Sequence, residues 1–313
     1  MITGLLWGCV RIESTLNVRR LVADMAIRLK SPPPSPPPAS INRTEIDVAG
    51  VPVSFPCRPY QQQVLFMEKL MQALQGSQNA LLESPTGTGK TAALLCALCA
   101  WSDAVAARST AHDMAVNGIL DEGLLSILNE ATGLSAPPAF LQRRPRIIYL
   151  SRTHSQLNQV VAQLKKTSYK PKVVVLASRE HSCLHERVKT MQGGEQIAEC
   201  KKLTKANACT LFANLSKDSG TDVQALLPPV QDIEDMVEAG KQHQLCPYFM
   251  ARNRLETADM IFMPYSYVAD PFLRRLHQSV LQGAVLVFDE GEANVAMHLR
   301  VVALTIWHRS QYS

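Results

Sequence analysis

The chain has 313 residues, 46% of them hydrophobic, and a formal net charge of +5. This length and composition allow a sizeable buried core and predict about two domains. We find no run of the roughly 18 apolar residues that a membrane span requires, and eight cysteines without a convincing secretory signal favour a reducing compartment over a disulfide scaffold.

The first 46 residues differ in composition from the rest of the chain. Met1–Lys30 has an apolar start and several arginines but also acidic residues, which makes a poor secretory signal and a weak organelle-targeting signal. The proline run over 31–38 favours extended polyproline geometry. We therefore expect residues 1–46 to form a disordered or targeting-like tail with a proline-rich linker.

From Asp47 onward the chain alternates short apolar strands with helices, which predicts an α/β fold with a parallel sheet covered on both faces. The predicted strands are 51–55, 79–83, 146–151, 172–178, 259–263 and 284–288, and the predicted helices are 61–74, 91–101 and 155–166, with a loop-like stretch over 102–144. The pattern indicates a doubly wound ATPase core over 47–178 and 255–290, an insert over 179–254, and a divergent tail over 291–313.

The stretch Ser84–Thr91 (SPTGTGKT) lies between a predicted strand and a predicted helix. In that context a glycine-rich turn directs main-chain N–H groups at phosphate oxygens, and the helix N-terminus adds roughly half a positive charge. Lys90 is expected to reach the β- and γ-phosphates and Thr91 to complete the Mg²⁺ shell. Ser84 replaces the first glycine of GxxxxGK[ST], and a simple connecting turn is the alternative. The predicted phosphate-binding residues are Ser84, Pro85, Thr86, Gly87, Thr88, Gly89, Lys90 and Thr91.

A second candidate for the nucleotide site is Asp289–Glu290, which follows the apolar run Val285–Phe288. At the carboxyl edge of a parallel sheet, Asp289 would hold the Mg²⁺ water shell and Glu290 would activate the attacking water. Alone, such a pair is often a solvated strand end. Together with the phosphate-binding loop, it predicts ATP hydrolysis with Lys90, Asp289 and Glu290 as catalytic residues.

The interrupted region contains Cys183, Cys200, Cys209 and Cys246, none of which forms a CxxC pair with another. Four thiolates are the usual ligands of a cubane iron–sulfur cluster, and Cys246-Pro247 is similar to the end of ferredoxin ligand runs. Spacing alone leaves iron–sulfur, zinc and scattered structural cysteines open. His181 and His185 flank Cys183 as further possible ligands.

A separate CxxC pair, Cys96 and Cys99, lies in a predicted helix among alanine and leucine and is expected to pack in the core.

Basic residues are frequent between Lys165 and Lys205. A local excess of positive charge favours a polyanionic partner, although an ordinary solvated surface has the same composition.

Six segments together resemble the N-terminal part of the iron–sulfur DNA helicases of superfamily 2. They are Phe55–Tyr60 (FPCRPY) with Gln63, Ser84–Thr91, Tyr149–Leu157 (YLSRTHSQL), Cys246–Tyr248 (CPY), Ile261–Tyr265 (IFMPY) and Val287–Glu290 (VFDE). Within that family the similarity points to the genome-maintenance helicases that act at telomeres and in recombination, and a sister helicase of crosslink repair carries the same motifs.

The resemblance implies a RecA-like domain interrupted by a small helical iron–sulfur domain, with ATP, Mg²⁺ and a [4Fe–4S] cluster as cofactors. It makes Gln63 the adenine-reading residue and assigns the cluster to Cys183, Cys200, Cys209 and Cys246. It implies single-strand contacts by Arg152, Thr153, His154, Ser155 and Gln156, for which a helix N-cap at Thr153 or Ser155 is the structural alternative. The implied activity is 5′-to-3′ unwinding in the nucleus, on branched DNA such as D-loops, telomeric loops and G-quadruplexes, with replication and repair proteins as possible partners.

Two departures limit this carry-over. The family continues Asp-Glu-Ala-His, whereas Gly291-Glu292-Ala293-Asn294 follows Glu290 here. The family also needs a second RecA-like domain with an arginine finger, so we expect a truncated chain that binds ATP and single strands weakly without unwinding DNA. A non-catalytic DNA-binding decoy with zinc is the alternative from another functional class.

Overall fold

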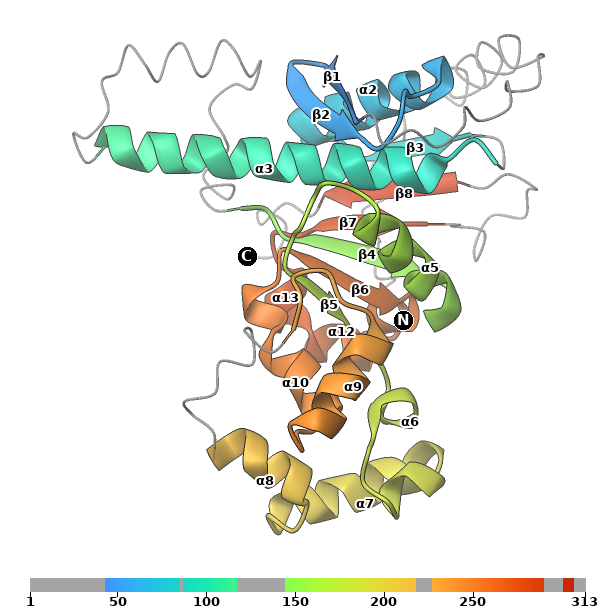
Figure 1. Ribbon diagram of the computed structural model, residues 1–313, viewed down its shortest axis with the longest axis vertical. Coiled ribbons are helices and arrows are strands. Elements are labelled where there is room, and N and C mark those ends of the chain that lie inside the picture. Colours follow the sequence, from blue (N-terminus) through green and yellow to red (C-terminus); the bar gives the residue numbers. More distant parts are fainter. Residues whose placement is uncertain (1–42, 85–86, 117–143, 218–226, 290–300, 307–313) are drawn as a thin grey trace, which may run out of the picture. The chain divides into compact units, whose positions relative to one another are not determined.

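The computed structural model describes residues 43–84, 87–116, 144–217, 227–289 and 301–306, all within one compact unit, Ser40–Ser313 (Figure 1). The described strands are β1 (Thr44–Val48), β2 (Val51–Phe55), β3 (Ala80–Glu83), β4 (Ile147–Ser151), β5 (Val173–Val175), β6 (Met260–Pro264), β7 (Val285–Phe288) and β8 (Val301–Ile306). The helices nearest the sheet are α2 (Gln61–Gln75), α3 (Lys90–Val116), α5 (His154–Lys165), α9 (Ile233–Gln242), α10 (Pro247–Asn253), α11 (Ser266–Ala269), α12 (Pro271–Leu276) and α13 (Gln278–Leu281). The predicted α/β class is confirmed.

The main sheet has the order β3-β8-β7-β4-β6-β5 (Figure 1). The pairs β4–β6, β4–β7 and β5–β6 are parallel, as predicted. The short strand β8 lies between β3 and β7 and is antiparallel to both. Strands β3 and β7 therefore run in the same direction without touching, and their carboxyl ends lie at one edge of the sheet.

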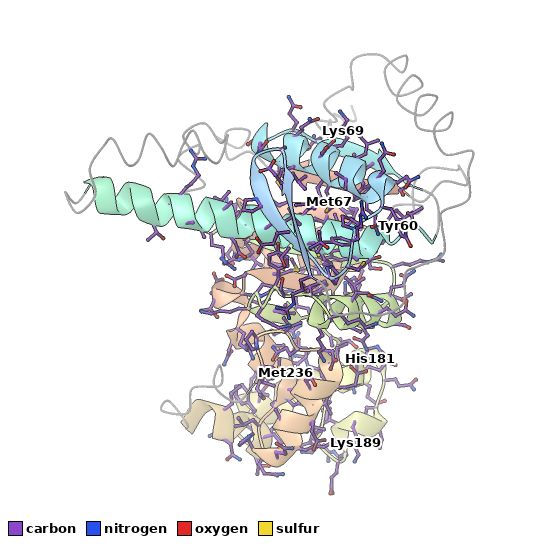
Figure 2. All side chains as sticks on the ribbon, turned by 45° about the horizontal axis from the view of Figure 1, so that its top comes forward. Tyr60, Met67, Lys69, His181, Lys189 and Met236 are labelled. Atoms are coloured by element: carbon purple, nitrogen blue, oxygen red, sulfur yellow. The ribbon has the colours of Figure 1, made fainter. Side chains whose placement is uncertain are left out.

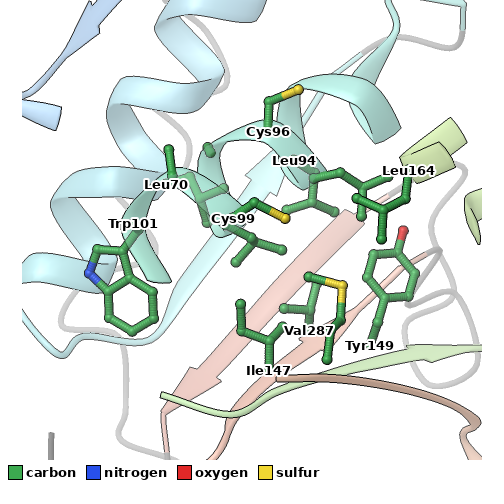
Figure 3. Close-up of a cluster of buried hydrophobic side chains, with 14 of the residues drawn as sticks. Leu70, Leu94, Cys96, Cys99, Trp101, Ile147, Tyr149, Leu164 and Val287 are labelled. Carbon is green, nitrogen blue, oxygen red and sulfur yellow. The ribbon is translucent and has the colours of Figure 1, made fainter. Parts of the chain in front are cut away.

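Each face of the sheet is covered by helices, and side chains alternate between the two cores as the strand period requires. Ile147, Tyr149 and Val287 pack against α2, α3 and α5, and Figure 3 shows them beneath Leu94 and Cys99 of α3. Side chains of the opposite parity, such as Ile148 and Leu286, pack against α9, α10, α11 and α13. Burial on both faces explains why these strands are continuous apolar runs.

Strands β1 and β2 form an antiparallel hairpin outside the main sheet. Its turn places Ala49 at φ 52° and Gly50 at φ 81°, and the Gly50 amide donates to the Asp47 carboxylate at 3.1 Å. Two successive positive φ values are typical of the tight turn that matches strand twist. Strand β1 begins at Thr44, three residues before the fold boundary expected at Asp47.

Helix α3 is much longer than the predicted 91–101 segment, because it continues to Val116. The prediction of a loop from Ser102 is therefore wrong as far as Val116, while residues 117–143 lie outside the described ranges. Of the described helices, only α3 is long and apolar enough, over Lys90–Thr110, to cross a membrane by length and composition. Since 61% of its apolar window is buried inside the protein, a core helix accounts for the same pattern.

The cysteine-rich region contains α6 (Arg179–Ser182), η2 (Val188–Thr190), α7 (Gly193–Lys205) and α8 (Thr210–Lys217), and η3 (Leu255–Thr257) follows α10. Figure 2 marks His181 and Lys189 on the segment ahead of α7, and Met236 on α9. Although α9 and α10 belong to the predicted insert, Met236 of α9 and Met250 of α10 lie in the core on one face of the sheet. The second half of residues 179–254 is thus packed on the RecA-like sheet.

Candidate nucleotide, DNA and cysteine sites

The phosphate-binding loop connects β3 to the N-terminus of α3, as the sequence predicts. Gly87 and Gly89 have φ values of 78° and 71°, a region that glycine adopts without strain. The Ser84 and Thr88 hydroxyls are 2.8 Å apart, and the Lys90 ammonium donates to the Ser84 carbonyl at 2.5 Å. Lys90 and Thr91 begin α3, and the N-terminus of a helix is a favourable place for a phosphate group. Pro85 and Thr86 lie outside the described residues.

Gln63 packs directly against this loop and is only 7% exposed. Its Nε2 donates to the Thr88 carbonyl at 3.0 Å, while its Oε1 accepts from the Tyr60 amide at 2.9 Å. Both ends of the side chain are therefore bonded within the protein. To read adenine, Gln63 would have to exchange one of these bonds for a base edge.

Asp289 follows β7 at the carboxyl edge of the sheet, the edge that also carries the phosphate-binding loop. Its main-chain amide donates to the Leu150 carbonyl at 2.9 Å, and its main-chain carbonyl accepts from the Tyr265 hydroxyl. Its carboxylate accepts from the Tyr149 hydroxyl at 2.5 Å. Glu290 lies outside the described residues, so only the first carboxylate of the pair is placed.

The segment after β4 forms the N-terminus of α5. Thr153 is the N-cap, accepting from the Gln156 amide at 3.2 Å, and Gln156 Oε1 accepts in return from the Thr153 amide at 3.2 Å. Arg152, Thr153 and Ser155 are exposed, whereas His154 and Gln156 are half-buried. The structural alternative at Thr153 is thus confirmed, and the three exposed side chains keep their polar groups at the surface.

The four cysteines of the interrupted region line one small cavity. It is also lined by Leu184, His185, Val188, Leu203, Thr204, Leu211 and Phe249. Burial raises the pKa of Cys246 to about 12 and also raises the pKa of Cys183. Among the described residues, no three potential ligands group closely enough to hold a single metal ion. Of the two flanking histidines, His185 belongs to this lining and His181 does not.

The predicted core role of Cys96 and Cys99 is confirmed, because they are 0% and 3% exposed within α3. Burial raises the pKa of Cys96 to about 12 and that of Cys99 further. Both thiols therefore remain protonated and inert at neutral pH.

Two side-chain clusters connect the cysteine-rich region to the sheet, and sequence reasoning missed both. The His154 and His181 rings meet edge-on, with their centroids 4.8 Å apart. The pKa of His154 is lowered, mainly by burial and to a smaller extent by the neighbouring His181. Over the Tyr248 ring lie the guanidinium groups of Arg179, at 3.9 Å, and Arg252, at 3.5 Å. The His154–His181 and Arg179–Tyr248 contacts join residues far apart in sequence, which no local pattern could indicate.

Some of the basic side chains between Lys165 and Lys205 are paired with carboxylates, and others are not. Lys165 is paired with Asp232 and Asp235, and Arg187 is paired with Glu199. Lysines that are exposed and have no carboxylate partner among the described ion pairs are Lys166, Lys170, Lys172, Lys189, Lys201, Lys202 and Lys205. Four of these seven, Lys189, Lys201, Lys202 and Lys205, lie between η2 and the end of α7, in the region that contains the cysteine cavity.

A larger cavity, of about 230 Å³, lies at the opposite, amino edge of the sheet. Its acidic lining is already paired, since Arg144 bridges Asp103 and Asp259. Burial raises the pKa of Asp103 in spite of that arginine. We regard this cavity as a structural ion-pair cluster, distant from the nucleotide edge.

Comparison with known families agrees with this arrangement. Residues 149–305, half of the chain, match the DEAD_2 family, and residues 58–210 match the DEAD/DEAH box helicase family. The chain belongs to the DEAD_2 family. Both matched ranges contain the Arg152–Gln156 segment; the first also covers Asp289, and the second covers the phosphate-binding loop.

Curated relatives of this DEAD_2 chain include two proteins named regulator of telomere elongation helicase 1. The Homo sapiens protein is 43% identical over 251 residues, covering 79% of this chain and 20% of its own length. The Drosophila erecta homologue is 38% identical over 253 residues, covering 78% of this chain and 25% of its own length. The resemblance to superfamily 2 DNA helicases is thereby confirmed, and the chain spans about a fifth to a quarter of these relatives.

A solved structure described as an XPD helicase also matches, with a TM-score of 0.43 and 19% identity, covering 75% of this chain and 33% of that one. A likeness this weak carries no structural conclusion.

Proposed function

We propose that this chain is the ATP- and DNA-binding N-terminal part of an ATP-dependent DNA helicase. The observation that carries the proposal is the placement of Lys90 and Asp289 at the same edge of one sheet, after two strands, β3 and β7, that run in the same direction. Membership of the DEAD_2 family supports the same activity. The chain covers about a fifth of the length of the Homo sapiens relative. We therefore propose that unwinding is an activity of the longer protein, to which this part contributes ATP and DNA binding.

In the proposed nucleotide site each residue has one task. Lys90 exchanges its bond to the Ser84 carbonyl for the β- and γ-phosphates, while the loop amides and the start of α3 hold the remaining phosphate oxygens. Thr91 and Asp289 supply oxygen ligands to the Mg²⁺ shell, and Glu290 is proposed to orient the attacking water. Bound Mg²⁺ would neutralise charge that develops on the transferred phosphoryl group.

The proposed DNA site is the exposed surface that begins at Arg152. The Arg152 guanidinium and the Thr153 and Ser155 hydroxyls are suited to phosphate contacts, which give affinity without reading sequence. His154 and Gln156 are more enclosed, so we assign them to shaping this surface together with the N-cap. Exposed lysines on α7 extend the positive surface toward the cysteine cavity.

We propose that the cavity lined by Cys183, Cys200, Cys209 and Cys246 holds a [4Fe–4S] cluster. The donor set fits, because four thiols face one cavity with otherwise mostly apolar walls, which is how protein thiolates hold such clusters. A cubane is wider than a single ion, so its ligand sulfurs stand further apart, in agreement with the lack of a close three-ligand group among the described residues. The cluster would fix the fold of residues 179–217 against α10.

The finer assignments are part of the same proposal. We infer a helical iron–sulfur insert within 179–254, 5′-to-3′ polarity, and action in the nucleus on branched DNA such as D-loops, telomeric loops and G-quadruplexes. The similarity to proteins named for telomere elongation supports this set over the crosslink-repair alternative.

The test is nucleotide and DNA binding by the purified chain. We expect weak ATP affinity that is lost in Lys90→Ala, and a DNA-stimulated ATPase rate far below that of a full-length helicase, because the family needs a second RecA-like domain with an arginine finger. ATP binding that is equally tight in Lys90→Ala would refute the nucleotide site. Metal analysis separates the zinc-binding decoy from the helicase part, since iron with inorganic sulfide supports the cluster, whereas one zinc per chain supports the decoy.

A further inference from the structure

The hydroxyl of Tyr149 donates a hydrogen bond to the Asp289 carboxylate at 2.5 Å. Tyr149 lies in β4, opposite Val287 of β7, and Asp289 is two residues further along and therefore on the same face of the sheet. The tyrosine is 0% exposed, and its ring lies 5.3 Å from that of Phe262. Figure 3 shows the ring standing between β4 and α3, so its hydroxyl has a fixed position.

We propose that Tyr149 is a positioning residue for magnesium binding, which it serves by holding the Asp289 carboxylate in one orientation. This inference rests on the proposed nucleotide site. It adds a residue from β4, a strand that contributes neither the phosphate-binding loop nor the acidic pair.

The geometry supports an orienting role because the main chain of Asp289 is also fixed. Its amide donates to Leu150 and its carbonyl accepts from Tyr265, so the backbone cannot rotate freely. The Tyr149 bond then fixes the remaining freedom, that of the side chain. One carboxylate oxygen, Oδ2, accepts from the phenol.

The chemistry favours the same role. A hydrogen bond from a neutral donor to a carboxylate is short and strong, so it holds the carboxylate in one orientation. Groups that orient metal ligands in this way commonly change metal affinity 10- to 100-fold when removed. A tyrosine that only filled the core would require a hydrogen-bond partner but would have no effect on magnesium.

The experiment compares Tyr149→Phe with the parent in the binding of a fluorescent ATP analogue, titrated with Mg²⁺ and repeated in EDTA. We expect the Mg²⁺ concentration at half-maximal binding to rise about 10-fold, with unchanged affinity in EDTA. Tyr267→Phe is the matched control, because Tyr267 is another buried tyrosine, 9% exposed, whose side chain contacts Arg252 instead of the nucleotide edge. Its Mg²⁺ midpoint should equal that of the parent.

Asp289→Asn supplies a second variant that keeps the packing around Tyr149. It should raise the Mg²⁺ midpoint itself, and adding Tyr149→Phe to it should cause no further rise. Equal loss of binding with and without Mg²⁺ in Tyr149→Phe would show a structural role only and overturn the inference. A parent chain that binds no nucleotide would instead refute the proposed function, and the inference with it, before any variant is compared.

Discussion

Gln63 on α2 and Gly89 in the phosphate-binding loop are in direct contact, and a side chain at position 89 would collide with the glutamine. A Cβ built on Gly89 lies 2.4 Å from Gln63 Nε2, the same nitrogen that donates to the Thr88 carbonyl. The loop is therefore shaped by a glutamine from a helix that precedes it in sequence by some 25 positions. This contact makes the loop sensitive to both residues.

Gly89→Ala is expected to weaken ATP binding for two separable reasons. The new methyl group displaces Gln63, and alanine at φ 71° carries strain of about 1 kcal/mol. Adding Gln63→Ala removes the collision but not the strain, so the loss of ATP affinity in the double variant should be smaller than the sum of the two single losses. Calorimetric titration of the two single variants and the double variant checks this, and strictly additive losses would contradict the contact.

The ion pair between α5 and α9 should make stability depend on acid. Burial alone would raise the pKa of Asp232, but Lys165 and the Asp235 amide outweigh it and hold the pKa below the usual range. A depressed carboxyl pKa contributes stability above the unfolded-state value and loses it as the pH falls through the folded-state value. Lys165→Met should therefore lower the free energy of unfolding by roughly 1 kcal/mol or less at neutral pH, and the difference should vanish at acid pH in urea titrations. A difference that persists in acid would assign the effect to packing.

Much of the fold could be predicted because its strands are buried on both faces. Strands β4, β6 and β7 are apolar throughout and were located to within a residue or two from that property alone. The second half of α3 was missed because serine and alanine were taken as loop residues, although Ser102 and Val105 are buried and alanine favours helices. Strand β8 follows no local signal beyond β-branched residues, and its pairing is long-range.

In the candidate site, too, some residues could be found from the sequence and others only from the fold. Lys90 could be found from sequence because the phosphate-binding motif has particular residue types at short spacing, whereas the four cysteines were assigned through the family resemblance, since their spacing alone left several roles open. Tyr149 could not, since a tyrosine in an apolar strand is ordinary until the fold brings Asp289 to its hydroxyl. A polar-tipped residue on the strand adjacent to the acidic one is the signal that would have found it.

We expect a substitution of a cysteine that lines the cavity to remove the cluster absorbance, and a substitution of a buried cysteine elsewhere to leave that absorbance unchanged. Cys209→Ser should abolish visible absorbance and lower the melting temperature, because a serine hydroxyl is a poor ligand for iron. Cys99→Ser is the matched control, as both cysteines are buried, at 7% and 3% exposure, but Cys99 lies in the sheet core. It should reduce stability while keeping the absorbance. Loss of colour in both variants would mean that absorbance reports general unfolding.

Arg152 is expected to contact DNA phosphate. Arg152→Ala should weaken single-strand binding equally for different sequences and reduce the slope of log affinity against log salt by about 0.7. Lys166→Ala tests the opposite end of the same helix, where an exposed lysine caps α5. Its affinity and salt slope should match those of the parent in fluorescence anisotropy, and a loss as large as that of Arg152→Ala would indicate nonspecific charge attraction.

Strand β8 should determine whether the two halves of the nucleotide site stay in register. Leu304 pairs with Ala80 of β3 on one side and with Val287 of β7 on the other, so its main chain bridges the strand before the phosphate-binding loop and the strand before Asp289. Leu304→Pro removes the donor from this central position, which a paired strand does not tolerate. We expect a lower melting temperature together with weaker ATP binding, and faster hydrogen exchange at the amides of β3 and β7. Leu304→Val, which keeps the amide and the strand preference, should behave like the parent, whereas a proline variant with unchanged melting and ATP affinity would show that β3 and β7 are held in register by other contacts.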